Sequence, residues 1–152
     1  MFEITLLGTD TIDEATALYR RMIEEYRRTD PRLSEMPVDD KSLRTMVAFS
    51  LDTENCLLFI LYRNGIPAGF IDSARVNAEG VEWYIKAVWL EEELRVPPVF
   101  QELVSHLERY VRLKGVERIF NTALLDDPIA DDLWAGAGYE REAGRRLKRL
   151  RE

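Results

Sequence analysis

The chain has 152 residues, of which 46% are hydrophobic and 32% charged, and its formal net charge is −7. This size and balance are typical of one globular domain that needs neither a disulfide nor a metal to fold. No apolar run is long enough to span a membrane and the N-terminus lacks a signal-peptide pattern, so we expect a soluble cytoplasmic protein without a membrane partner; the negative charge argues against nucleic-acid binding and fits an amine substrate better.

The N-terminal third of the sequence predicts one strand and two helices. Alternating apolar residues indicate a strand over residues 2–7. Apolar residues at helical spacing then indicate a helix that ends near residue 28, and prolines keep the segment 28–37 as a loop. A second helix follows and ends near Asp52. The candidate capping residues are Asp10 or Thr11 for the first helix and Asp39 or Asp40 for the second.

The middle of the sequence predicts three strands. Residues 56–63 are nearly all apolar, and Asn64-Gly65 separates them from a second run over 66–76, which is a strong hairpin signal. Aromatic and β-branched residues over 81–90 predict a central strand. The single cysteine, Cys56, can form neither an internal disulfide nor a CxxC metal site, so we expect a buried thiol and no metal.

A long helix and a further strand come next. Apolar residues at helical spacing run from Val99 to Val111, and Gly115 is the stop signal. Residues 116–125 predict a strand. A short helix then begins at Asp126-Asp127-Pro128, with proline in its first turn.

Two short strands, over residues 139–142 and 145–150, are predicted to close the chain. The second lies in the basic segment GRRLKRLR, which we interpret as a solvated edge strand, the alternative being an RNA contact. No repeat or linker divides the sequence, so we expect a single domain over residues 1–152.

This order of elements resembles the GNAT superfamily of N-acetyltransferases over nearly the whole chain. The hairpin LLFILYRNGIPAGFI is similar to the family's second and third strands, which carry a Gly-aromatic pair, and DDPIADDLWAGAGYERE is similar to the family's closing segment. The resemblance implies an α/β (α+β) fold, with a mixed central sheet of about six to seven strands flanked by about four helices. The matching residues are Gly69-Phe70 in the hairpin and Asp127, Ala130, Leu133-Trp134 and Gly138-Tyr139 in the closing segment.

The family's diagnostic segment, Q/R-x-x-G-x-G/A, falls on residues 95–100 when the register of the long helix is kept. Only Arg95 matches it, because Pro98 and Phe100 replace the small residues. In the family this loop presents backbone N–H groups at a helix N-terminus to the pyrophosphate of coenzyme A. Proline has no N–H, so Pro97 and Pro98 remove two potential donors.

The resemblance still implies acetyl-CoA as the cosubstrate, bound weakly. Arg95 and the N–H groups of Val99, Phe100 and Gln101 remain as phosphate ligands. Losing one or two hydrogen bonds to a charged group weakens binding by about ten-fold to ten-thousand-fold. The alternative is that Pro97-Pro98 only starts a helix and no phosphate binds there.

The sequence departs from the family pattern at the position of the general acid. The family's tyrosine, which protonates the departing thiolate, corresponds to Trp134, whose N–H has no useful acidity, so the acid would be Tyr139, Tyr84 or solvent. Tyr139 could instead simply fill the core. Glu82, which shares a strand face with Tyr84 and Lys86, is the candidate base, with a salt bridge as its alternative role.

Further cofactor contacts are implied near the central strand and the closing helix. A backbone N–H at Val88, Trp89 or Leu90 would polarise the thioester carbonyl, as in an oxyanion hole. Trp134 and Asp127 would lie beside the cofactor, although Asp127 could equally be a helix cap.

Two functions remain open on the sequence. The first is transfer of an acetyl group from acetyl-CoA to a primary amine of a small molecule or peptide. The second is a non-catalytic binding or dimerisation module that has lost coenzyme A affinity. The resemblance also implies a possible homodimer formed through edge strands.

Overall fold

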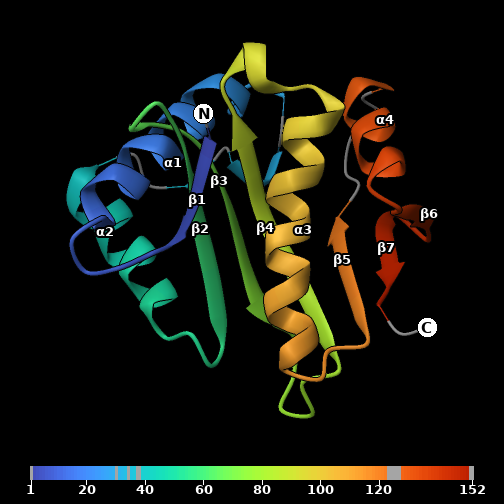
Figure 1. Cartoon of the computed structure of the whole chain (residues 1–152). Coiled ribbons are helices and arrows are strands. Elements are labelled where there is room, and N and C mark those ends of the chain that lie inside the picture. Colours follow the sequence, from blue (N-terminus) through green and yellow to red (C-terminus); the bar gives the residue numbers. More distant parts are fainter. Residues whose placement is uncertain (1, 30, 34, 37–38, 123–127, 151–152) are drawn as a thin grey trace.

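The computed structural model describes residues 2–29, 31–33, 35–36, 39–122 and 128–150. The described residues form one seven-stranded mixed sheet in the order β1-β2-β3-β4-β5-β7-β6, in which only β4 and β5 run parallel (Figure 1). The elements are β1 (Phe2–Leu6), α1 (Ile12–Tyr26), η1 (Pro31–Leu33), α2 (Asp40–Ala48), η2 (Phe49–Leu51), β2 (Cys56–Arg63), β3 (Ile66–Arg75), β4 (Glu82–Leu90), η3 (Glu92–Leu94), α3 (Pro97–Leu113), β5 (Arg118–Thr122), α4 (Pro128–Gly136), β6 (Glu140–Glu142) and β7 (Arg145–Arg149). The predicted α/β fold, a mixed sheet flanked by helices, is confirmed.

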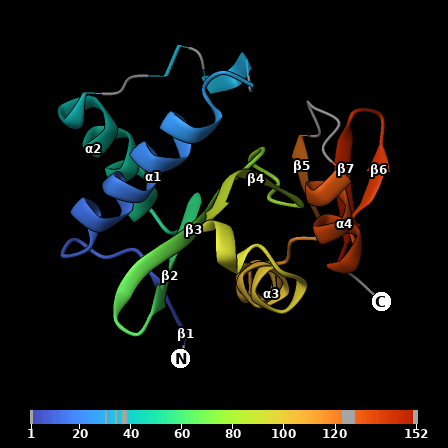
Figure 2. The same ribbon diagram turned by 90° about the horizontal axis from the view of Figure 1, so that it is seen from above.

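Helices cover the two faces of the sheet unequally. Figure 2 shows α1 and α2 over β1 to β3 on one face. On the other face α3 packs against β2 and β3, and α4 lies beside β7. Each face has its own core cluster, because residues of β2 alternate between them: Leu57 and Phe59 pack toward α3, whereas Leu58 and Ile60 pack toward α1. Within the described residues, no helix covers the α1 side of β5 and β7.

The predicted hairpin is confirmed in its turn chemistry. Asn64 and Gly65 have φ angles of 52° and 81°, which suits the two-residue turn that an Asn-Gly pair favours. Gly69, further along β3, is required by close packing, since an added Cβ would lie 2.8 Å from the carbonyl oxygen of Trp89. The glycine thus lets β3 and the end of β4 approach each other.

β4 contains a bulge at its centre. Asp72 of β3 is opposite Ala87 and Ser73 is opposite Ile85, so Lys86 is an extra residue without an opposite partner. The pairing of β4 with β5 ends at the same place, at Ile85 opposite Asn121. The bulge at Lys86 therefore coincides with the end of the pairing between β4 and β5.

Several predicted element boundaries were too wide, most of them by one residue, and those of α1 and β5 by about two. α1 ends at Tyr26 rather than near residue 28. β5 begins at Arg118 rather than at 116, because Gly115 (φ 83°) and the bond from the Val116 N–H to the Val111 carbonyl still belong to the turn after α3. Residues 123–125 of that predicted strand lie outside the described residues.

The prediction of a basic edge strand was wrong. β7 lies between β5 and β6, and β6 is the edge. The basic side chains of β7 face acidic groups: Arg146 pairs with Asp131 of α4 at 2.8 Å, and Lys148 pairs with Glu108 of α3 at 3.0 Å. These ion pairs connect β7 to α4 and α3.

No helix in the described ranges combines the length and apolar character that crossing a membrane requires.

Candidate active site

Among the described residues, no strand pairs with β4 on its β5 side beyond Ile85, and this part of β4 is here called its free edge. The two strands are paired only from Glu82 to Ile85, whereas β4 continues to Leu90, and they diverge toward their C-terminal ends (Figure 1). The Glu91 N–H donates to the Ala68 carbonyl on the β3 side, so by the alternation of an antiparallel ladder the N–H groups of Val88 and Leu90 point toward β5. Of the three residues named for backbone contacts, Val88 and Leu90 therefore direct their N–H groups away from β3, whereas the backbone of Trp89 faces β3.

The start of α3 offers fewer donors than predicted. Pro97 and Pro98 occupy the first two positions of the helix and have no N–H. The Phe100 N–H already donates to the Val96 carbonyl at 3.1 Å, and Gln101 lies one residue deeper, where N–H groups bond within the helix. The expectation that Phe100 and Gln101 supply free N–H groups was wrong, and Val99 supplies the one free N–H among the residues described in this turn.

Arg95 is held by groups from α1 and β4. Its Nε donates to the Leu90 carbonyl at 2.8 Å, and its Nη2 lies 2.7 Å from Oε1 of Glu25. Trp89 donates to the same Glu25 oxygen at 3.1 Å, and the guanidinium lies 5.8 Å from the Trp89 ring centroid. The hydrogen bond from Arg95 lowers the pKa of Glu25, so the arginine is already paired with an anion just before the start of α3.

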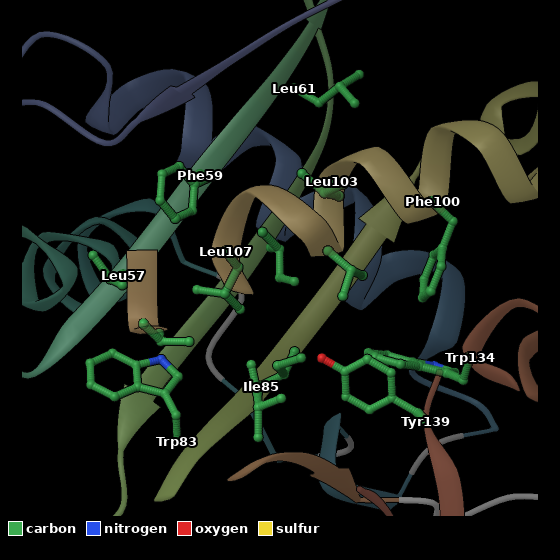
Figure 3. Packing of buried hydrophobic residues seen from close by; sticks show 14 of the residues in the cluster. Leu57, Phe59, Leu61, Trp83, Ile85, Phe100, Leu103, Leu107, Trp134 and Tyr139 are labelled. Atoms are coloured by element: carbon green, nitrogen blue, oxygen red, sulfur yellow. The ribbon is translucent and has the colours of Figure 1, made fainter. Parts of the chain in front are cut away.

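The side chain of Phe100 is buried in the seam between α3 and α4. It is 4% exposed and meets Trp134 edge-on, with ring centroids 4.9 Å apart. Trp134 in turn meets Tyr139 edge-on at 4.9 Å, and Figure 3 shows the three rings side by side. Gln101 also links α3 to the end of α4, because its Nε2 donates to the Gly136 carbonyl at 3.1 Å.

Tyr139 lies away from the free edge of β4, within the core. It is 3% exposed, its hydroxyl donates to Oε2 of Glu108 at 2.8 Å, and burial raises its pKa well above the usual value. A phenol so enclosed and so weakly acidic is a poor proton donor to a thiolate.

Glu82 and Tyr84 lie on the uncovered face of the sheet. Oε2 of Glu82 is 3.0 Å from Nε of Arg118, its neighbour on β5, so the carboxylate is in an ion pair. The Tyr84 hydroxyl accepts from Oγ1 of Thr122 at 3.3 Å, and its ring lies 5.2 Å from that of Phe120. Of these two candidates, Tyr84 is the nearer along β4 to the point where the strands part.

A buried polar cluster beside Lys86 was missed by the sequence reasoning. Asp72, 2% exposed, accepts from the hydroxyl of Tyr19 and from Oγ of Ser50 at 3.1 Å, and Nζ of Lys86 lies 3.4 Å from its Oδ2. Burial raises the pKa of the Asp72 carboxyl. The signal available in the sequence was an aspartate inside the apolar strand 66–76, which is costly to bury without partners.

Asp127, a predicted cofactor contact, lies outside the described residues.

The comparisons with known proteins agree on one fold. The sequence profile described as the acetyltransferase (GNAT) family matches residues 15–139. A GNAT-family acetyltransferase from Streptococcus pneumoniae is 12% identical with a TM-score of 0.81, and the match covers 98% of this chain and 99% of that one. The PaiA N-acetyltransferase from Thermoplasma acidophilum, solved with coenzyme A, is 11% identical with a TM-score of 0.77 and the same coverage.

An aminoglycoside 6'-acetyltransferase of type Ii is 16% identical with a TM-score of 0.72, over 99% of this chain and 98% of that one. At these identities the structural matches speak for the fold alone. No curated protein sequence matches the chain.

Proposed function

The chain belongs to the acetyltransferase (GNAT) family, and from that premise we propose that it transfers an acetyl group from acetyl-CoA to the primary amine of a small molecule or peptide. The observation that carries the proposal is the free edge of β4 beyond Ile85, where the N–H groups of Val88 and Leu90 point toward the diverging β5. An amide-bearing arm such as pantetheine can add to such an edge as an extra strand.

The same edge supplies electrostatic help to the reaction. A thioester carbonyl beside the Val88 N–H would be polarised, and the negative charge that develops on its oxygen would be stabilised. The acceptor amine would approach over the uncovered sheet face, where Tyr84 lies. We assign Tyr84 rather than Tyr139 as the proton donor to the leaving thiolate, because Tyr139 is enclosed and bonded to Glu108.

The non-catalytic alternative is favoured by the start of α3. Two prolines occupy its first positions and Arg95 is paired with Glu25, so a pyrophosphate would find few ligands. On this second hypothesis the fold is kept and the cofactor is lost.

Calorimetric titration with acetyl-CoA and with S-acetylpantetheine, which has the arm but no pyrophosphate, separates the two hypotheses. We expect both to bind, with little advantage for acetyl-CoA, since the β4 edge does most of the binding. Thiol release in the presence of primary amines then tests turnover. If neither compound binds at millimolar concentration, the transferase is excluded and the non-catalytic module remains.

The Pro98→Ala variant provides a matched test of the phosphate loop. It restores one N–H at the helix start, so acetyl-CoA should bind about ten-fold more tightly, while S-acetylpantetheine should bind as before. Equal tightening of both compounds would show that the loop does not face the pyrophosphate.

A further inference from the structure

Lys86 lies at the point where β4 and β5 part. It is the extra residue of the β4 bulge, and it directly follows the last pair between the two strands, Ile85 opposite Asn121. Val88, whose N–H faces the gap, is two residues further on, about 7 Å along the strand. Lys86 is thus the amine on β4 that stands nearest to the place proposed for the thioester.

The amine of Lys86 already has a proton acceptor. Its Nζ lies 3.4 Å from Oδ2 of Asp72, a carboxylate that is 2% exposed and accepts from Tyr19 and Ser50. The lysine side chain itself is 35% exposed, so it reaches from the open face of the sheet down to the buried acid.

We propose that Lys86 is an acetyl acceptor within the chain, and that Asp72 takes up the proton its ammonium must lose before it reacts. The inference rests on the proposed function, since acetyl-CoA is the acetyl donor. The flexible four-carbon stem of Lys86 lets its Nζ turn from Asp72 toward the neighbouring gap.

The proton and bond changes balance within these groups. The Lys86 ammonium gives one proton to the Asp72 carboxylate, and the neutral Nζ attacks the acetyl carbonyl carbon. A new C–N bond forms, the C–S bond breaks, and the second proton on nitrogen passes to the leaving thiolate. The products are an acetylated Lys86, a protonated Asp72 and the free thiol of coenzyme A.

Burial of Asp72 suits this outcome. Removing the positive partner of a buried carboxylate normally leaves an uncompensated charge, which is strongly destabilising. Here the carboxylate becomes neutral as the lysine does, and it keeps the hydroxyl groups of Tyr19 and Ser50 as neighbours. The raised pKa of the Asp72 carboxyl is in keeping with a stable protonated product.

The experiment is incubation of the whole chain with acetyl-CoA, followed by tryptic digestion and mass spectrometry. Acetylation blocks trypsin at Lys86, so the peptide 76–95 should survive intact and carry one acetyl group. Lys148 is the matched control, because it too is partly buried and paired with a buried carboxylate, at 3.0 Å from Glu108, but on the other face of the sheet. Exposed Lys41 and Lys114 report the uncatalysed background.

We expect Lys86 to be acetylated about 10²-fold faster than these three lysines, because it is held beside the donor, and its rate should saturate with acetyl-CoA. The Asp72→Asn variant should lower that rate about 10²-fold, as loss of a general base does. Ser50→Ala, which keeps the carboxylate, should change it little. A thermal melt of each variant shows that the fold persists.

The calorimetric titration keeps the two proposals distinct. If acetyl-CoA binds but Lys86 is acetylated no faster than Lys148 and Lys114, the acceptor role is overturned and the proposed function stands. If acetyl-CoA does not bind, both fail. If Lys86 is acetylated quickly but equally fast in Asp72→Asn, the role of Asp72 as proton acceptor is overturned.

Discussion

Two buried carboxylates in this protein are held by the same kinds of partners on opposite faces of the sheet. Asp72 accepts from the Tyr19 hydroxyl and pairs with Lys86, while Glu108 accepts from a tyrosine hydroxyl at 2.8 Å and pairs with a lysine at 3.0 Å. They are 2% and 6% exposed. The chemistry of the two clusters is therefore nearly identical.

Their positions in the fold differ. Lys148 also donates to the Ala137 carbonyl at 2.8 Å, so it is tied down between α3 and α4. Lys86 has Asp72 as its one ion-pair partner among the described residues, and it stands at the end of the β4–β5 pairing, on the opposite side of the sheet from α4. The comparison teaches that the position of an ion pair in the sheet, and not the types of its residues, makes it a candidate for a catalytic role.

The largest expected effect is a difference in the free energy of unfolding between variants of the two buried carboxylates. Asp72→Ala leaves two buried hydroxyls and the Lys86 ammonium without their acceptor, so we expect a loss of about 3–5 kcal/mol in the free energy of unfolding. Glu108→Ala should cost less, about 1–3 kcal/mol, because Lys148 keeps the Ala137 carbonyl. Urea unfolding measures both, and the reverse order would contradict the comparison.

The second prediction compares turnover in variants of Tyr84 and Tyr139. Tyr84→Phe should lower turnover in acetyl transfer by about 10²-fold with little effect on stability, since a proton donor is lost from the uncovered face. Tyr139→Phe should leave turnover nearly unchanged and cost about 1.5–3 kcal/mol of stability, because Glu108 loses a hydrogen bond. Turnover and thermal unfolding of both variants, compared side by side, decide between them; a large loss of turnover in Tyr139→Phe would restore it as the acid.

The third prediction concerns pH. Burial raises the pKa of Asp72 in the folded state, so the folded protein holds this proton more tightly than the unfolded chain does. This contribution to stability is fully present below the ordinary aspartate pKa and is lost as pH rises through the folded pKa. The stability of wild type relative to Asp72→Asn should therefore decline as pH rises through that window, as measured by urea unfolding at a series of pH values; a rising difference would show that ion pairing with Lys86 outweighs burial.

The smallest effect is expected at Glu25, a carboxylate bound to Arg95 but 38% exposed. Arg95 lowers its pKa, so its contribution is present above the ordinary glutamate pKa and is lost as pH falls through the folded pKa. Glu25→Gln should cost less than about 1 kcal/mol, since solvent screens the pair. The exposed neighbour Glu24 provides the control variant Glu24→Gln. A loss of stability in Glu25→Gln as large as that in Asp72→Ala would remove the distinction between buried and exposed carboxylates.

Much of the fold could be predicted from the sequence because its signals are local. The turn at Asn64-Gly65 depends on two adjacent residues, and the order of strands and helices follows from apolar periodicity. The missing donors at Pro97 and Pro98 were also predictable, because proline lacks an N–H wherever it stands. The predicted edge strand failed because strand order in a sheet depends on which distant segments pair, and β6 rather than β7 took the edge.

The candidate site was only partly predictable. The free N–H groups of Val88 and Leu90 depend on where β5 leaves β4, and the pairing of Arg95 joins residues 70 positions apart. Lys86 was visible in the sequence as a neighbour of Tyr84, but its contact with Asp72 depends on a one-residue bulge. Such contacts are set by register, which shifts a side chain to another face when it slips by one residue.

The sequence by itself determined the elements, the family resemblance and the lack of two N–H groups at the start of α3, since these depend on residue types and short spacings. The tertiary structure alone decided that Tyr139 lies in the core, that Glu82 is paired with Arg118, and that Lys86 meets a buried acid at the opening of the sheet. The physical reason is that packing and strand register bring together groups whose separation along the chain carries no information about their distance in space.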